Sequence, residues 1–337
     1  MAPQSDETEL KSAWAAMAAQ HGAPGWSSIP IGAGGGRLRA GVRHPGNAEA
    51  LLVGFGQIQQ PQPGQLPRGR GFAVTAIEPG TDADRPHWFV LCRELAGSRE
   101  LFERMAMDIV RTVSASIGGD ERALFQIFLS RIRAWQSFME KPEDGLLSLE
   151  SQIGLIGELV TLEQLLGLLP DPVATVEAWR GPLDGVQDFF LGHGSIEVKA
   201  TASPHGFPAK ISSLEQLDQT VRSPVLLAAV RLTVQASGLT LPGWVDRLRS
   251  VLETGPARPL FENRLLQARY FDGNRDAYTV AFSHVATRLI ELADDFPCLI
   301  RSLVHPAVLQ AKYEVDLDLT RAVTVAWEEA LQRVGVS

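Results

Sequence analysis

The sequence contains few cysteines and no long apolar run. Its 337 residues include two cysteines, Cys92 and Cys298, which lie far apart and form no CxxC pair. This argues against a disulfide framework or a zinc knuckle, and the apolar neighbours of both cysteines predict buried thiols. No stretch approaches the ~18 to 20 apolar residues that a membrane span needs. The polar, acidic start does not resemble a secretory signal. We therefore expect a cytoplasmic protein that makes no membrane contact.

Positive charge is also scarce. The net charge is -8, and residues 151–240 contain nine acidic and five basic residues. A broad electrostatic footprint for nucleic acid is therefore not expected, and any such role must be local or assisted by a partner. The chain has 26 arginines but only five lysines, so a lysine within an apolar strand is unusual for this sequence.

The length allows about two domains, or one large domain with additions; the composition along the chain favours two. We expect an N-terminal α+β region over 1–140 and a second domain over 141–337, with its core at 146–235 and a C-terminal α/β extension. The break is the segment KPEDG at 141–145. Before it, short apolar runs predict strands and periodic apolar residues predict helices. The expected strands are 37–42, 50–57, 72–77 and 88–92, and the expected helices are 100–116, 121–140 and 146–169.

The order of expected elements in the second domain is typical of an α/β core in which helices flank a mixed sheet. We expect a strand that ends at Trp179, a hairpin over 188–201, a helix over 212–221 and a buried strand over 224–234. Further elements are expected farther along, namely a helix near 244–252, a turn at 272–275, strands at 278–282 and 307–317, and a helix around 320–334.

The hairpin DFFLGHGSIEVKATAS at 188–203 contains acidic and basic residues in a regular pattern. If Leu191 faces Ile196, then Asp188 faces Lys199, and Asp188, Glu197 and Lys199 share one side of the hairpin. The other side then enters the core through Phe189, Ile196 and Val198. A plainer interpretation is also open, in which Asp188 and Lys199 form an exposed ion pair worth about 0 to 1 kcal/mol.

The triplet Glu-x-Lys alone carries little information. A second copy, Glu9-Leu10-Lys11, lies in an expected helix, where a spacing of two puts the charges on different faces. The hairpin differs because its lysine is set in an apolar strand. Desolvation shifts the pKa of a lysine ammonium readily, which suits a residue that orients or deprotonates water.

Glu158 is a third acid with an unusual setting. In the expected helix, Leu155 and Leu162 place it on an apolar face, and Gly154 and Gly157 allow a close approach to a sheet. A carboxylate on such a face should be neutral, paired or bound to a cation. The alternative is a rotated helix, in which Glu158 reaches solvent.

In this order, GLIGEL (154–159), Asp188 and IEVK (196–199) resemble the PD-(D/E)XK nuclease superfamily. The wider pattern, with AWRGP, DFF, IEVKATA and ISSLEQL, is similar to a bacterial family placed in that superfamily and often encoded near restriction and phage-defence genes. The resemblance implies a restriction-endonuclease-like α-β-β-β-α-β core. It covers most of the chain and is most specific over 148–232. One departure is the missing Pro-Asp pair, which leaves Asp184, in GPLDG, as a rival to Asp188.

The resemblance also implies a chemistry. Asp188, Glu197 and the carbonyl of Val198 would bind Mg²⁺, or Mn²⁺ in its place, with Glu158 contributing directly or through water. Lys199 would position or deprotonate the nucleophile. The expected activity is Mg²⁺-dependent endonucleolytic hydrolysis, with DNA as substrate and defence-system proteins as possible partners. The alternative is a non-catalytic scaffolding subunit that retains the fold. The sequence leaves the oligomeric state open.

Four other polar residues are further candidates for the site. Gln216 lies where some members of the superfamily have a further active-site residue, but Ser213-Leu-Glu-Gln216 favours a helix-capping box. His193 and His205 are expected at the surface rather than as ligands. Lys210 suits either a phosphate contact or an exposed loop.

Overall fold

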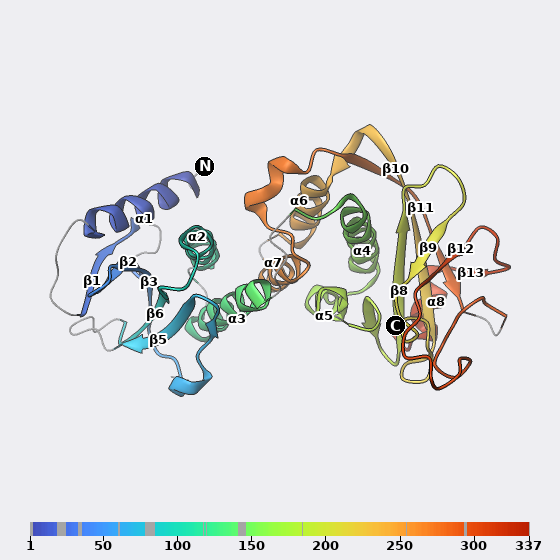
Figure 1. Cartoon of the computed structure of the whole chain (residues 1–337), viewed down its shortest axis with the longest axis horizontal. Helices are drawn as coiled ribbons and strands as arrows, with labels where there is room; N and C mark the ends of the chain where they lie inside the picture. The colour runs from blue at the N-terminus through green and yellow to red at the C-terminus, as the bar shows by residue number, and fades with distance from the viewer. Residues whose placement is uncertain are drawn as a thin grey trace. The chain divides into compact units, whose positions relative to one another are not determined.

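The computed structural model describes residues 3–18, 25–32, 36–59, 61–77, 85–116, 118, 120–140, 146–183, 185–253, 255–292 and 295–336. The chain divides into two compact units, Met1–Glu143 and Asp144–Ser337 (Figure 1). The expected break at 141–145 lies outside the described residues. Across the described ranges, no helix combines the length and the apolar character that crossing a bilayer would require.

The first unit is built on one antiparallel sheet with the strand order β1-β2-β3-β6-β5-β4. Three helices, α1 to α3, accompany it, and the short 3-10 turn η2 precedes β4. The elements are α1 (Pro3–Ala18), β1 (Gly25–Pro30), β2 (Leu38–His44), β3 (Ala48–Phe55), η2 (Pro63–Gln65), β4 (Arg68–Gly69), β5 (Phe72–Ile77), β6 (His87–Arg93), α2 (Arg99–Ala115) and α3 (Glu121–Glu140).

The main core of this unit lies between the helices and one face of the sheet. Phe55 and Phe89 from β3 and β6 meet Phe125 and Phe128 from α3, with ring centroids 4.8 to 6.4 Å apart. Trp14 of α1 packs there too, and its indole nitrogen donates a hydrogen bond to the carbonyl of Ala50. The four strands and two helices expected in this region are present, and β1 was not anticipated.

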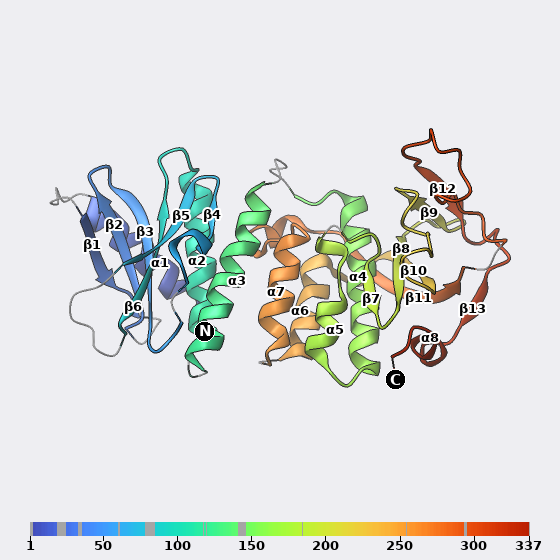
Figure 2. The ribbon, with the colours of Figure 1, turned by 90° about the horizontal axis from the view of Figure 1, so that it is seen from below.

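The second unit contains a five-stranded mixed sheet in the order β13-β11-β10-β8-β7 and a separate ribbon of β9 and β12. Figures 1 and 2 show α4, α5, α6 and α7 on one side of the mixed sheet. The elements are α4 (Leu149–Leu168), α5 (Pro172–Ala178), η3 (Gly181–Leu183), β7 (Phe189–Leu191), β8 (Gly194–Thr201), β9 (Pro208–Ile211), β10 (Val225–Thr240), α6 (Leu241–Leu252), α7 (Ala257–Gln267), η4 (Asp272–Ala277), β11 (Ala281–Glu291), β12 (Tyr313–Asp316), β13 (Val323–Val325) and α8 (Trp327–Arg333).

Strand β10 is the centre of this sheet, parallel to β8 and antiparallel to β11. Its alternate residues enter two different cores, Leu226 on the α4 side and Leu227 on the side of β9. Helix α4 approaches β8 at Gly157, where an added Cβ would lie 2.5 Å from the Cβ of Ala200. Gly154 has no such neighbour within 4 Å, so only one of the two expected close approaches exists. The mixed α/β class expected from the sequence is correct.

Several expected elements differ from the structure. Residues 175–179, expected as a strand, belong largely to helix α5, and no helix forms over 212–221, which is a series of turns. Helix α7 was not anticipated, strand β12 covers only part of 307–317, and the last helix is shorter than 320–334 because β13 precedes it. These differences leave the hairpin and α4 in place.

Candidate functional site

The hairpin of β7 and β8 pairs Phe189 with Ile196 and Leu191 with Gly194. The expected register, with Leu191 opposite Ile196 and Asp188 opposite Lys199, is therefore wrong by two residues. The turn is tighter than expected because Gly192, at φ +48°, allows a two-residue connection. Side chains alternate with a period of two, so an even shift keeps each residue on its face. Phe189, Ile196 and Val198 are buried in the core, as expected.

Asp188 lies at the point where β7 diverges from β8. Its Oδ2 accepts a 2.7 Å hydrogen bond from the backbone amide of Val198, two residues beyond the last paired position of β8. Its carbonyl accepts hydrogen bonds from the amides of Arg180 and Gly181. Asp188 thus occupies the open edge of β8, where the side chain takes the place of the missing strand. Asp184, the rival aspartate, lies outside the described residues.

Glu158 reaches this edge from α4. Its Oε2 accepts a 2.6 Å hydrogen bond from the indole nitrogen of Trp179, which lies at the end of α5 and is fully buried. The alternative of a rotated helix with Glu158 in solvent is therefore wrong. Trp179 was not expected as a partner of Glu158, although it belongs to the segment AWRGP on which the family resemblance partly rests.

Gly181 shows how closely the two acids approach. A Cβ added there would lie 2.6 Å from Oε2 of Glu158 and 2.7 Å from Oδ1 of Asp188. Both carboxylates therefore point into the space above one glycine, which any larger residue would fill. Glu158 therefore lies beside Asp188 at the start of the hairpin.

Glu197 and Lys199 lie on the face of β8 opposite α4. The Lys199 ammonium is 2.7 Å from Oε1 of Glu197, whose side chain is 2% exposed. Lys199 therefore pairs with Glu197 and not with Asp188 as the expected register implied. In contrast, the control triplet behaves as expected: Glu9 contacts Gly32, and Lys11 contacts Glu103.

Gln216 joins this pair from the turns that follow β9. Its Oε1 lies 3.4 Å from the Lys199 ammonium and accepts a 2.7 Å hydrogen bond from the amide of Ser212. The expected capping box is wrong because no helix begins at Ser213. The other expectation, from the superfamily resemblance, is a Gln216 near the active-site residues, and Gln216 does lie beside Lys199.

Burial raises the pKa of all three acids, and the charge of Asp188 raises the pKa of the other two further. Burial, followed by the charges of Asp188 and Glu197, raises the pKa of Glu158 well above its ordinary value, although the Trp179 hydrogen bond opposes this. Burial also raises the pKa of Asp188, against the Val198 amide. Burial and the charge of Asp188 raise the pKa of Glu197 to about 8, with Lys199 opposing. The site thus concentrates negative charge that nearby groups only partly offset.

The donor chemistry suits a hard divalent cation, which prefers carboxylate oxygens. Glu158 and Asp188 already converge, and their raised pKa values mark a place where a cation would relieve repulsion. Even so, in the described ranges no three Asp, Glu, His or Cys side chains form a complete metal-binding group. The reason lies in the sheet: Glu158 arrives from the α4 side of β8, whereas Glu197 lies on the other side and is held by Lys199.

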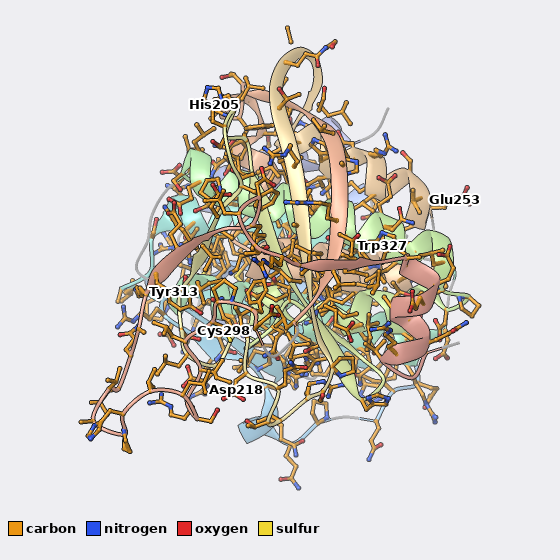
Figure 3. The ribbon with its side chains drawn as sticks, turned by 90° about the vertical axis from the view of Figure 1, so that its right-hand side faces the viewer. His205, Asp218, Glu253, Cys298, Tyr313 and Trp327 are labelled. Atoms are coloured by element: carbon orange, nitrogen blue, oxygen red, sulfur yellow. The ribbon has the colours of Figure 1, made fainter. Side chains whose placement is uncertain are left out.

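The remaining candidates lie away from this edge. His193 and His205 are exposed, as expected, and Lys210 pairs with Glu150 in solvent. Figure 3 shows His205 far from Cys298, which is half-buried on the same side of the unit as Tyr313. Cys92 is buried, and burial raises the pKa of its thiol to about 11. Both cysteines are free.

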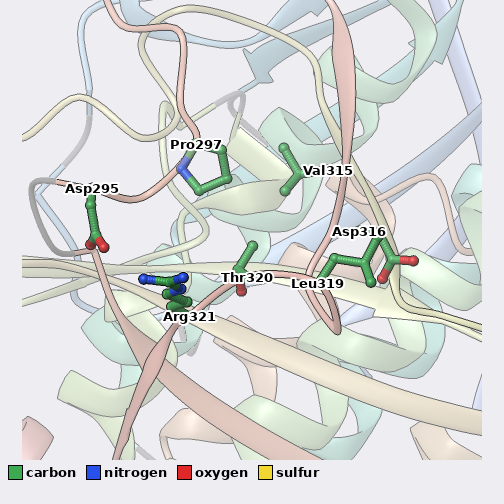
Figure 4. A pocket seen from close by; sticks show the side chains of 7 residues that line it. All are labelled: Asp295, Pro297, Val315, Asp316, Leu319, Thr320 and Arg321. Atoms are coloured by element: carbon green, nitrogen blue, oxygen red, sulfur yellow. The ribbon is translucent and has the colours of Figure 1, made fainter.

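A pocket of about 510 Å³ opens elsewhere in the second unit (Figure 4). None of the four candidate site residues lines it. Its walls come from the segment after β11 and from β12 and the residues that follow: Asp295, Pro297, Val315, Asp316, Leu319, Thr320 and Arg321.

Comparison with known proteins adds the family. No curated protein and no solved structure matches the chain. A family model described as "Putative PD-(D/E)XK family member, (DUF4420)" matches residues 10–318, which includes α4, the hairpin and most of both units. The chain therefore belongs to this PD-(D/E)XK family.

Proposed function

We propose that the protein is a metal-dependent nuclease that hydrolyses phosphodiester bonds in DNA. The observation that carries this proposal is the approach of Glu158 and Asp188 above Gly181, next to the Glu197–Lys199 pair on β8. Membership of a PD-(D/E)XK family supports the same reaction class. The acidic surroundings suit a site that takes up a cation before it meets a phosphate.

The order of elements supports a restriction-endonuclease-like core. Helix α4 is followed by the antiparallel pair β7 and β8, by β9, and then by β10, which lies parallel to β8. Three features depart from the expected plan: α5 lies between α4 and β7, β9 pairs with β12 outside the mixed sheet, and turns replace the helix between the third and fourth strands. We propose that these turns take over its place and supply Gln216 to the site.

The cation would be held by Asp188, Glu197 and the carbonyl of Val198, with Glu158 as a further or water-mediated ligand. When bound, Mg²⁺ or Mn²⁺ lowers the pKa of a coordinated water and offsets negative charge at the phosphate. Lys199 positions the attacking water through its ammonium, or accepts the proton of that water as the neutral amine. The water adds to phosphorus, the bond to the leaving oxygen breaks, and that oxygen takes up a proton. The products are a phosphate monoester and a free hydroxyl.

The test is cleavage of supercoiled plasmid by the purified chain with Mg²⁺ or Mn²⁺, with chelator as the blank. Replacement Lys199→Ala is expected to lower the rate by about 10²-fold or more, the usual range for loss of a proton-transfer group. Lys11→Ala, in the other E-x-K triplet, is the matched control and should cleave like the wild type. Equal cleavage by the Lys199→Ala and Lys11→Ala proteins would contradict the proposal.

A second function has one observation in its favour. In the described ranges the carboxylates do not close into a three-residue metal group, as in a scaffolding subunit that keeps the fold and has lost catalysis. Titration with Mn²⁺ separates the two functions. Binding that disappears in Asp188→Asn supports the nuclease, whereas no binding at the carboxylates supports the scaffold.

The biological setting follows from the family resemblance alone. Genes of similar proteins often lie near restriction and phage-defence genes, so we propose a role in such a system, with partner proteins that bring the chain to DNA. Phage challenge of cells that carry the wild-type or the Lys199→Ala gene within its native locus tests this role. Equal plating efficiency on both would contradict it.

A further inference from the structure

The two units differ in charge. Residues 1–143 contain 15 acidic and 15 basic residues, and residues 144–337 contain 24 acidic and 16 basic residues. The whole net charge of -8 therefore comes from the second unit. The first unit is electrically neutral, so local clusters of its arginines are not overwhelmed by an acidic surplus.

Within the described part of the first unit, one face of the sheet carries no α-helix. Helices α1, α2 and α3 lie on the other face (Figures 1 and 2), where α3 packs against Phe55 and Phe89. The strand register puts Arg39 and Arg43 of β2 on the helix-free face, together with Trp26 of β1 and Trp88 of β6. A small second cluster lies beneath them, formed by Ala48, Ala50, Leu52, Trp88, Val90 and Cys92.

The arginines on this face lie over aromatic rings. The guanidinium of Arg43 is 6.0 Å from the ring centre of Trp26, and that of Arg39 is 5.9 Å from the ring centre of Trp88. Arg39 also donates hydrogen bonds to the hydroxyl and the carbonyl of Ser28. These contacts fix the guanidinium groups in place without neutralising their charge.

Neither arginine has a carboxylate partner among the residues that the structure describes. Most arginines elsewhere do: Arg37 pairs with Glu121, and Arg93 and Arg99 pair with Glu49. The register adds Arg68 of β4 to the helix-free face and places no described Asp or Glu on it. This face is therefore a fixed, positively charged surface on a neutral unit.

We propose that the helix-free face binds the sugar-phosphate backbone of a nucleic acid. Phosphate oxygens accept two parallel hydrogen bonds from one guanidinium, which suits arginines that are already ordered by stacking. Trp88 is only 2% exposed, so its ring is covered and does not stack on a base. The arginine contacts are therefore to phosphate and independent of sequence. This proposal stands on its own observations and goes beyond the carboxylate site.

The test is binding without cleavage, measured by fluorescence anisotropy with a labelled duplex in chelator, using the full-length Lys199→Ala protein. The double replacement Arg39→Gln and Arg43→Gln is expected to weaken binding about tenfold at low salt and to reduce the slope of log K against log salt by about 2. The charge-matched control is Arg104→Gln with Arg333→Gln, because both arginines already pair with carboxylates.

The design separates the outcomes. The proposal would be overturned if the double variant bound with the affinity and salt slope of the control protein, or if the parent protein bound no duplex. Either result counts whatever the cleavage assays show. Because Arg39 packs on Trp88, circular dichroism is used to check that the double variant folds. A second double variant, Arg43→Gln with Arg68→Gln, changes two exposed positions, and its binding is measured in the same way. Parallel arms with DNA and RNA duplexes of one length show which backbone is preferred. Weaker binding of the double variant to either duplex supports recognition of the phosphate groups that DNA and RNA share.

Discussion

The indole nitrogen of Trp179 donates a 2.6 Å hydrogen bond to Oε2 of Glu158. This bond holds the Glu158 carboxylate toward Asp188, although burial and repulsion between the two acids favour their separation. A buried tryptophan is a rigid donor, so the acid cannot easily turn away. Charge held together in this way destabilises the folded chain until a cation or a proton offsets it. The first two predictions follow from this destabilisation of the folded chain.

Replacement Glu158→Gln is expected to stabilise the metal-free protein at pH 8. The pKa of Glu158 is raised above 4.5 by burial and by its acidic neighbours, so the folded state holds a proton that the unfolded state has lost. Stability therefore falls as the pH rises above 4.5. Glutamine keeps an acceptor for Trp179 and cannot ionise. Each kcal/mol gained corresponds to about 2 to 4 °C in Tm for a domain of this size.

Thermal unfolding in chelator at several pH values measures this effect. The gain should shrink toward pH 4.5, where both states of the wild type are more fully protonated. Glu163→Gln, on the same helix, is the control, because it removes a partly exposed ion pair with Arg247 that is worth only about 0 to 1 kcal/mol. A Glu158→Gln protein that melts below the wild type at pH 8 would refute the argument.

Mn²⁺ binding is expected to tighten as the pH rises toward 8. Carboxylates bind a metal ion in the ionised form, and burial raises the pKa of Glu197 to about 8. Below that pH the metal must displace a proton, and above it the proton is already gone. Calorimetry at pH 7 in two buffers of different ionisation enthalpy should show proton release, with less release in Glu158→Gln. Affinity that is the same at pH 6 and pH 8 would exclude this coupling.

Replacing each of two glycines of α4 with alanine should change the free energy of unfolding in opposite directions. At Gly157 an added Cβ would lie 2.5 Å from the Cβ of Ala200, whereas at Gly154 nothing lies within 4 Å. We expect Gly157→Ala to destabilise by about 1 to 3 kcal/mol because α4 must move off β8, and Gly154→Ala to stabilise by up to about 1 kcal/mol through helix propensity. Urea unfolding measures both. If the two variants shifted stability in the same direction, α4 would not approach β8 as described.

The apolar face of α4 and the core face of the hairpin could be predicted from the sequence because both depend on periodicity. The spacing of Leu155 and Leu162 around Glu158 indicates burial whatever packs against the helix. The hairpin register was wrong by two residues, yet Phe189, Ile196 and Val198 kept the core face, since only an odd shift exchanges the two faces. Which residue pairs with Lys199 depends on the turn, and the φ of Gly192 is not visible in the pattern.

The segments around Trp179 and Gln216 were harder to predict. Helix α5 begins with Asp171 as its cap and Pro172 in its first turn, signals that precede the apolar run expected to be a strand. In 212–221, side chains bond to nearby amides and compete with a helix: Gln216 accepts from Ser212, and Asp218 accepts from Thr220. The packing that selects these turns involves distant residues, so local sequence could not reveal it.

Gln216 provides the last prediction, because it links Lys199 to these turns. Its Oε1 contacts both the Lys199 ammonium and the amide of Ser212. Under the proposed nuclease function, Gln216→Ala should lower the cleavage rate by about 10- to 100-fold, as loss of a residue that orients a site group usually does.

The matched control is Gln219→Ala, which removes hydrogen bonds to Leu292 and Val225 in the same turns without a contact to Lys199. Both variants lose two contacts of the turns, so their melting temperatures should fall by similar amounts, and only Gln216→Ala should lose activity. Equal cleavage rates in the two variants would mean that Gln216 supports the turns alone. A rate loss confined to Gln216→Ala would show that the turns in place of the expected helix serve the site through Lys199.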